Sequence, residues 1–265
     1  MCVTSLKDQV NGTNGSSTED SYVPDKLGDA MKYGNRELTA HEAAKVLEIS
    51  ERHAEALLKD RLIAGRQLRS GVWLTSKASV ERYRATAQSG RGRALSASTA
   101  WGLLWELSGR RPSWLPSSTL ARVRRQIETF SPEEIVRATS GRTRARFYTI
   151  SRGTSDISWG NSLVRTGRPA ARHLGVRAGN FNYASGYVRD GTSADFARRH
   201  AMSEDYEGRN VLFDNTLPIT YPGAAMPDAV VAVDMTLTGG EYERERGLLA
   251  LAMLQRKWME ARQKI

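Results

Sequence analysis

The stretch Leu38-Thr-Ala-His-Glu-Ala-Ala-Lys-Val-Leu-Glu-Ile-Ser50 decides the fold of the first half of the chain. Thr39 and Glu42 have the spacing of a capping box, which predicts that a helix starts at Ala40. The dipeptide at 48–49 then predicts a tight turn, and Ser50 is a suitable N-cap for a second helix over residues 51–59. Two such short helices bury little surface by themselves, so the pattern predicts a helix-turn-helix that packs on further elements.

The residues that follow supply those further elements. The segment from Leu62 to Leu74 alternates around Ser70-Gly71, which predicts a β-hairpin with a tight turn. Thr75 or Ser76 can cap a helix whose inner face carries Val80 and Tyr83. A helix-turn-helix, a hairpin and a helix in this order form the arrangement of a winged helix.

With these elements the sequence resembles the excisionase and mercury-resistance-regulator type of winged helix. That family has the pattern Leu-Thr-x-x-Glu-Ala-Ala-x-x-Leu-x-Ile/Val-Ser, followed by Gly-Arg, a Trp, and a closing helix similar to Leu-Glu-x-Tyr. The matching positions are 38–50, Gly65-Arg66, Trp73 and 80–83. The resemblance implies that the helix starting at Ser50 enters a major groove of double-stranded DNA and that the hairpin follows the phosphates.

The candidates for DNA contact are the polar residues that the predicted core does not need. On the second helix and the wing these are Ser50, Arg52, His53, Lys59, Arg66, Arg69 and Ser70. Arg52 can bind guanine O6 and N7, and the helix N-terminus at Ser50 can hold a phosphate. On the stretch that follows the domain, Arg91 and Arg93 can reach an adjacent minor groove.

Two acidic residues disagree with this interpretation. Glu51 and Glu55 stand where members of the family usually carry basic or neutral residues. A carboxylate near phosphate weakens DNA binding, although a glutamate can also accept a hydrogen bond from cytosine N4. A domain that binds protein in place of DNA is therefore the alternative.

The distribution of charge favours a polyanionic partner for the same half of the chain. The 265 residues include 39 Lys and Arg and 29 Asp and Glu, for a formal net charge of +10. Residues 36–168 carry 24 of the basic and 12 of the acidic residues, whereas residues 169–265 carry 12 of each. The surplus of positive charge thus belongs to one stretch of the chain, and that stretch contains the predicted winged helix, which favours a nucleic-acid partner.

Helix and strand signals continue through the rest of the chain. Helices are predicted after the N-cap Ser96, over 117–129, and from the capping box that starts at Ser131. Residues 210–213 and 229–235 are short β-branched or apolar runs and are predicted strands, and a last helix is predicted over 241–263.

The predicted fold class is mainly α with a winged helix-turn-helix, followed by a mixed α/β C-terminal domain. The expected divisions are a disordered tail over 1–36, the winged helix-turn-helix over 37–86, a basic linker over 87–94, a helical Arg-rich segment over 95–146, and a domain for partner binding or oligomerisation over 147–265.

Part of this region resembles, more loosely, actinobacterial helix-turn-helix proteins akin to abortive-infection (AbiE-type) antitoxins. The matching features are the helix with Trp101, the Arg-rich helix at 120–127, and the segments 142–148, 165–175 and 208–213. The resemblance implies a repressor of its own operon, in a toxin–antitoxin-like or mobile-element setting, that binds a cognate toxin.

A second contact with DNA is expected because one winged helix reads few base pairs. A homodimer on repeated half-sites would provide it, and so would a second phosphate-binding face made of arginines. The candidates for that face are Arg122, Arg124, Arg125, Arg142, Arg144 and Arg146. A solvated helix face is the alternative interpretation of the same residues.

Catalysis, metal binding and membrane insertion find little support in the sequence. A nuclease would draw on Asp228, Asp234, Glu241, Glu243, His173 and His200, but Asp228 and Asp234 are interpreted as turn and strand-end residues, so no catalytic residue is predicted. The histidines lack metal-ligand spacing, Cys2 is the only cysteine, and no cofactor motif is found. No apolar run could span a bilayer, and a soluble cytoplasmic protein is expected.

A small-molecule effector is a further alternative. Trp159, Phe181, Tyr183 and Tyr187 could line a pocket in the C-terminal half, although aromatic residues at such positions more often pack in a core.

Overall fold

The structure is a computed structural model that describes residues 37–60, 62–87, 95–150, 160–176, 183–205 and 207–263. The tail predicted over residues 1–36 lies outside the described residues, as do Arg91 and Arg93 of the predicted linker. The described residues form a mixed α/β fold with two β-sheets.

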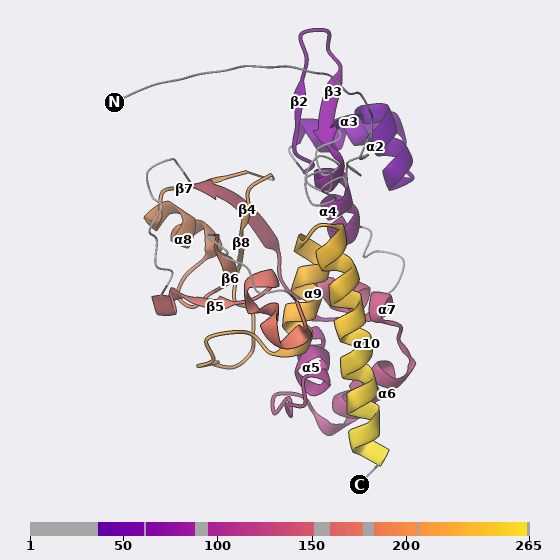
Figure 1. The fold of residues 1–265 in the computed structure, drawn as a ribbon, viewed down its shortest axis with the longest axis vertical. Helices are drawn as coiled ribbons and strands as arrows, with labels where there is room; N and C mark the ends of the chain where they lie inside the picture. The colour runs from indigo at the N-terminus through magenta and orange to yellow at the C-terminus, as the bar shows by residue number, and fades with distance from the viewer. Residues whose placement is uncertain are drawn as a thin grey trace, which may run out of the picture. The chain divides into compact units, whose positions relative to one another are not determined.

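The first described elements are built around a small sheet (Figure 1). In chain order they are β1 (Glu37–Thr39), α2 (Ala40–Leu47), α3 (Glu51–Lys59), β2 (Gly65–Gln67), β3 (Trp73–Ser76) and α4 (Lys77–Ala87). The central strand, β3, pairs antiparallel with β1 on one side and with β2 on the other. Leu47, Leu58, Ile63 and Val80 belong to the buried core of this part.

The predicted starts of α2 and α3 are confirmed. The Thr39 hydroxyl accepts a hydrogen bond from the Glu42 backbone N–H, and the Glu42 carboxylate accepts one from the Thr39 backbone N–H at 2.8 Å. Glu48 ends α2 in the left-handed conformation, with φ of 56°. The Ser50 hydroxyl then caps α3 by accepting from the His53 N–H. These local hydrogen bonds set the short turn between the two helices.

The remaining elements combine helices with a larger sheet. The helices are α5 (Ala97–Leu107), α6 (Ser117–Thr129), α7 (Pro132–Thr139), α8 (Ser193–Arg199), α9 (Asp228–Thr238) and α10 (Glu241–Gln263), with 3₁₀ helices η2 (Ser140–Arg142), η3 (Gly160–Ser162) and η4 (Arg168–Leu174). The strands are β4 (Ala145–Ile150), β5 (Leu163–Arg165), β6 (Ser185–Val188), β7 (Met202–Glu204) and β8 (Asn210–Phe213), in the order β5-β6-β8-β4-β7. β6 and β8 are parallel, and the other neighbours are antiparallel.

One hydrophobic core joins these helices to the sheet. It includes Trp101 and Val123 from before residue 146, and Phe213, Val230 and Trp258 from after it. The boundary predicted between residues 146 and 147 therefore does not separate two cores. Trp101 and Val123 pack with the C-terminal residues because α5 lies against α9 and α10, and α6 lies against α5 and α10. Figure 1 shows these helices grouped together.

The prediction of a strand over Ala229–Met235 is wrong, because these residues form most of helix α9. Val230, Val231 and Val233 favour strands by propensity, but every residue from Ala229 to Leu237 is buried in the core. A helix that is buried on all sides shows no polar face, so its sequence resembles that of a buried strand.

Helices α9 and α10 approach each other closely at Gly247. A Cβ atom at this position would lie 2.6 Å from the Ala232 carbonyl oxygen and would also overlap the Thr236 hydroxyl. We expect Gly247→Ala to lower the free energy of unfolding by about 1–3 kcal/mol, because the helices must separate to admit the methyl group. This loss is expected in spite of the higher helix propensity of alanine, which favours the variant by roughly 1 kcal/mol.

Urea unfolding followed by circular dichroism measures this effect. The matched control is Gly141→Ala in η2, where an added Cβ meets no atom within 4 Å. We expect the control to stay within about 0.5 kcal/mol of the wild type. Equal losses in the two variants would contradict a close helix crossing at Gly247.

Candidate nucleic-acid interface

Four of the predicted DNA-binding residues are exposed on or next to α3. Ala54, Leu57 and Leu58 are buried against the rest of the fold, which leaves the opposite side of the helix exposed. Ser50, Arg52, His53 and Lys59 are all exposed. Arg52 and Lys59 are two helical turns apart and therefore point to the same side. The structure thus brings these residues together on one accessible surface.

The two glutamates of α3 differ in their surroundings. Glu55 is exposed and lies between Arg52 and Lys59 along the helix. Glu51 contacts α2, because its Oε2 lies 3.0 Å from Nδ1 of His41. This contact turns the Glu51 carboxylate toward α2. The sequence did not predict the contact, since the two residues are on different helices and ten positions apart.

The three predicted wing residues differ in their contacts and in their positions on the hairpin. Arg66 is on β2, and its guanidinium donates to both carboxylate oxygens of Glu37, at 3.0 and 3.1 Å. Both side chains are more than half exposed, so solvent weakens this ion pair. Arg69 and Ser70 are exposed in the turn, which is closed by the Leu68 N–H donating to the Val72 carbonyl at 2.8 Å. Arg69 is the cation at the end of the hairpin.

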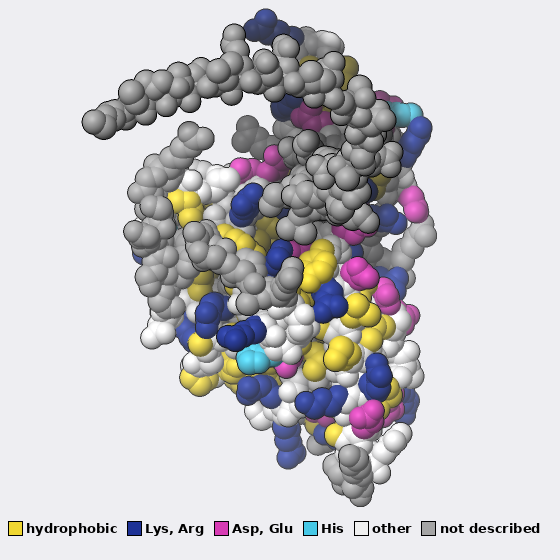
Figure 2. All heavy atoms as spheres, in the orientation of Figure 1, with side chains coloured by type: hydrophobic (Ala, Val, Ile, Leu, Met, Phe, Trp, Pro, Cys, Tyr) yellow, Lys and Arg dark blue, Asp and Glu magenta, His cyan; other side chains and the backbone are white. Residues whose placement is uncertain are grey.

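The six arginines of the predicted second phosphate face are not in equivalent positions. Arg122 and Arg125 are exposed on α6, whereas Nε of Arg124 is 2.7 Å from a carboxylate oxygen of Glu106. Arg144 is exposed, and Arg146 pairs with Glu204 at 3.6 Å. In the view of Figure 2, Lys and Arg side chains are interspersed with acidic and hydrophobic ones.

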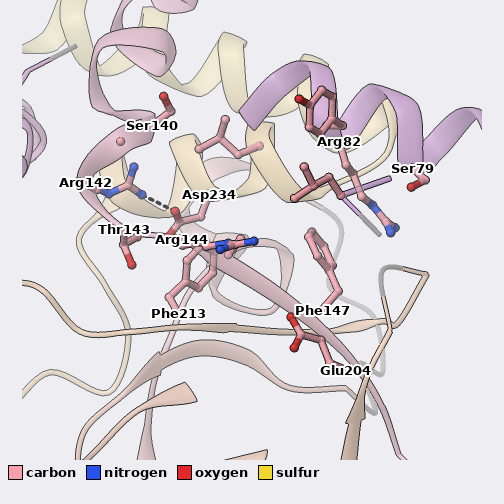
Figure 3. A pocket seen from close by; sticks show the side chains of 15 residues that line it. Ser79, Arg82, Ser140, Arg142, Thr143, Arg144, Phe147, Glu204, Phe213 and Asp234 are labelled. Carbon is pink, nitrogen blue, oxygen red and sulfur yellow. Dashed lines mark hydrogen bonds and ion pairs between the residues drawn. The ribbon is translucent and has the colours of Figure 1, made fainter. Parts of the chain in front are cut away.

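The assignment of Arg142 to that face is wrong, because its side chain is buried in the core at 1% exposure. Its guanidinium pairs with Asp234 of α9 (Figure 3) and donates to the Tyr187 hydroxyl at 3.0 Å and to the Thr139 carbonyl at 3.0 Å. A side chain with these buried partners cannot reach phosphate. The three arginines at 142, 144 and 146 are spaced by two residues, and this spacing alone does not reveal which of them points inward.

Asp234 is the centre of a buried polar network. Besides Arg142, its carboxylate accepts hydrogen bonds from the Thr166 hydroxyl at 2.6 Å and the Tyr187 hydroxyl at 2.9 Å. Burial raises the pKa of the Asp234 carboxyl, and the charge of Arg142 opposes this rise. Burial also raises the pKa of the Tyr187 phenol well above its usual value, which keeps the hydroxyl proton available to Asp234. The network joins η2, the loop between β5 and η4 at Thr166, β6 and α9.

The acids considered for a nuclease do not converge in the described part of the chain. The interpretation of Asp228 and Asp234 as residues flanking a strand is wrong, since both lie on α9. Glu243 pairs with Arg168, and the His200 ring packs at a tilt of 39° on the Phe196 ring, with centroids 4.3 Å apart. No three His, Cys, Asp or Glu side chains among the described residues are placed to hold a metal ion.

Of the four aromatic residues considered for an effector pocket, the structure describes Tyr183 and Tyr187. Tyr187 is buried in the core, where its ring stacks on Phe213 at 4.7 Å. Tyr183 is half-buried, and Trp159 and Phe181 lie outside the described residues.

Comparison with known proteins identifies no relative: the chain matches no family model, no curated protein and no solved structure. Among the described helices, none is long and apolar enough to cross a membrane.

Proposed function

We propose that the chain is a sequence-specific DNA-binding transcriptional regulator, in which α2 and α3 form the helix-turn-helix and the β2–β3 hairpin forms the wing. One observation carries the proposal. A capped helix with Arg52, His53 and Lys59 on its exposed side stands beside a hairpin that ends in Arg69. This combination suits a helix that reads base edges and a wing that contacts phosphate.

The contacts of the acidic residues support the same function. The Glu51 carboxylate contacts the His41 ring of α2 at 3.0 Å through an exposed hydrogen bond. Glu37 holds Arg66 through an exposed ion pair, which a phosphate group can replace at little cost. Glu55 is on the exposed side of α3 with Arg52 and Lys59, where it can accept a hydrogen bond from cytosine N4.

In this proposal the regulator represses its own operon, of the toxin–antitoxin or mobile-element kind that the looser resemblance implies. Arg122 and Arg125 on α6 provide further exposed cations. A second copy of the chain on a repeated half-site provides the additional base contacts that a single reading helix lacks.

Binding to a protein partner is the second candidate function, and exposed apolar side chains on α10 favour it. Tyr242, Leu249 and Met253 are 46%, 49% and 64% exposed. Their spacing of seven and four residues places them on one side of the helix. A cognate toxin protein is the partner that the looser resemblance implies.

The reading helix is tested by Arg52→Ala. We expect the variant to weaken binding to the chain's own promoter by about 1–3 kcal/mol while changing binding to scrambled DNA much less, because Arg52 is proposed to contact a base. Arg69→Ala should weaken binding to both DNAs alike, because a contact with phosphate carries no sequence information. Fluorescence anisotropy at two salt concentrations measures these affinities.

The matched control is Arg125→Ala, which removes the same charge from an exposed position on α6. It should not change the preference for the promoter. Equal losses on promoter and scrambled DNA for Arg52→Ala would rule out base reading by this residue. A wild-type protein with no preference for its promoter at either salt concentration would favour the protein-binding alternative.

A further inference from the structure

A cavity of about 320 Å³ lies where α4 meets the segment that runs from η2 into β4. On the α4 side it is lined by Ser79, Arg82 and Tyr83, and on the other side by residues 140–145 and Phe147. Figure 3 shows lining side chains from different elements, with Asp234 and Phe213 on one side of the view and Ser79, Arg82 and Phe147 on the other. The Arg82 guanidinium lies over the Phe147 ring, 4.8 Å from its centroid, and so links the two sides.

The walls of this cavity combine flat apolar surfaces with positive charge. Rings and aliphatic side chains line it, namely Leu62, Tyr83, Phe147, Phe213 and Leu237. The two acids that line it are already engaged, since Asp234 is bound by Arg142 and Glu204 pairs with Arg146. Arg144, by contrast, is exposed and pairs with no acid in the described part of the chain.

A cationic, aromatic-lined cavity selects for an anion with a flat apolar body. A guanidinium binds a carboxylate through two parallel hydrogen bonds, and aromatic walls favour a ring. A cavity of about 150 Å³ is large enough for benzene, so a volume on the order of 320 Å³ suits a molecule of one or two rings. We propose that this cavity binds a small aromatic carboxylate, with the carboxylate on Arg144 and the ring against the apolar side chains that line the cavity.

The ligand would contact α4 and β4 at the same time. α4 begins at Lys77, directly after β3 of the hairpin ends at Ser76. Occupancy would therefore stabilise one placement of the hairpin and α3 relative to the larger sheet. This regulatory consequence rests on the proposed function, whereas binding of the ligand does not.

Isothermal titration of the full chain with 2-naphthoate, without DNA, tests the site. We expect saturable binding of one molecule per chain. Arg144→Gln should weaken it at least about tenfold, and uncharged 2-naphthamide should bind correspondingly less tightly to the wild type. The matched control is Arg125→Gln, which removes the same charge from α6 outside the cavity and should keep the wild-type affinity.

A second variant tests the location at the apolar wall of the cavity. Tyr83 lines it from α4 and is half-buried. Tyr83→Ala should fold, as checked by its urea unfolding curve, and should weaken binding of 2-naphthoate. No saturable binding to the wild type up to about 10 mM, or wild-type affinity in both Arg144→Gln and Tyr83→Ala, would overturn the proposal. Because DNA is absent, these outcomes are independent of whether the protein binds its promoter.

Discussion

Asp234→Ala is expected to lower the free energy of unfolding by about 3–5 kcal/mol. The substitution leaves the Arg142 guanidinium buried without a counter-charge. It also removes the acceptor for the Thr166 and Tyr187 hydroxyls. Equilibrium unfolding in urea, followed by circular dichroism, measures the loss.

The matched control removes an acid from the same helix. Asp228 is the first residue of α9 and is not buried, so Asp228→Ala should cost no more than about 1 kcal/mol through its interaction with the helix dipole.

A double variant separates the buried charge from the other contacts. Arg142→Met combined with Asp234→Leu leaves no charge in the core, so it should be more stable than Asp234→Ala. It should remain below the wild type, because the Thr166 and Tyr187 hydroxyls still lack their acceptor. A double variant as unstable as the single one would show that the unpaired charge of Arg142 is not the cause.

Trp101→Ala is expected to cost a similar 3–5 kcal/mol, mainly through the cavity that it leaves. The Trp101 side chain is fully buried, and its ring meets the Tyr187 ring edge-on with centroids 5.3 Å apart. The Arg142 guanidinium lies 5.2 Å from the centre of the indole. Nε1 donates to the Thr216 hydroxyl at 3.0 Å, and this hydroxyl donates in turn to the Arg142 carbonyl at 2.7 Å.

Trp114→Ala is the matched control for this measurement. Trp114 is only half-buried, and its ring contacts Trp105 at 5.7 Å. We expect a clearly smaller loss in the same urea experiment, because the surroundings of a partly exposed site can relax and water can enter. Equal losses would argue against the tight packing seen around Trp101.

Trp101 and Asp234 should also be coupled, since both contact Arg142. The loss in a variant that carries both alanine substitutions should differ from the sum of the single losses by at least about 0.5 kcal/mol. Additive losses would show that Arg142 does not connect the two side chains energetically.

Local signals allowed much of the secondary structure to be predicted from the sequence. The caps at Thr39, Ser50, Ser96 and Ser131 are all present in the structure. A cap is a hydrogen bond between residues three positions apart, so both of its partners can be recognised within a short stretch of sequence. Helical periodicity likewise predicted which side of α3 is exposed.

Contacts between distant segments were not visible in the sequence. Glu37 meets Arg66 across β3, and His41 meets Glu51 across the turn between two helices. These pairs depend on strand order and on the angle between helices, which no local pattern encodes. Each pair engages a charged side chain of the candidate interface.

The sequence by itself determined where the helices begin, which side of α3 is polar, and where the positive charge is concentrated, because each depends on residues close together in the chain. Only the tertiary structure decided that residues 229–235 are helical and that Arg142 is buried while Arg144 is exposed. The physical reason is that burial is a property of the assembled core. An apolar run buried on every side has no period, and an arginine enters a core only when the fold supplies its partner, here Asp234.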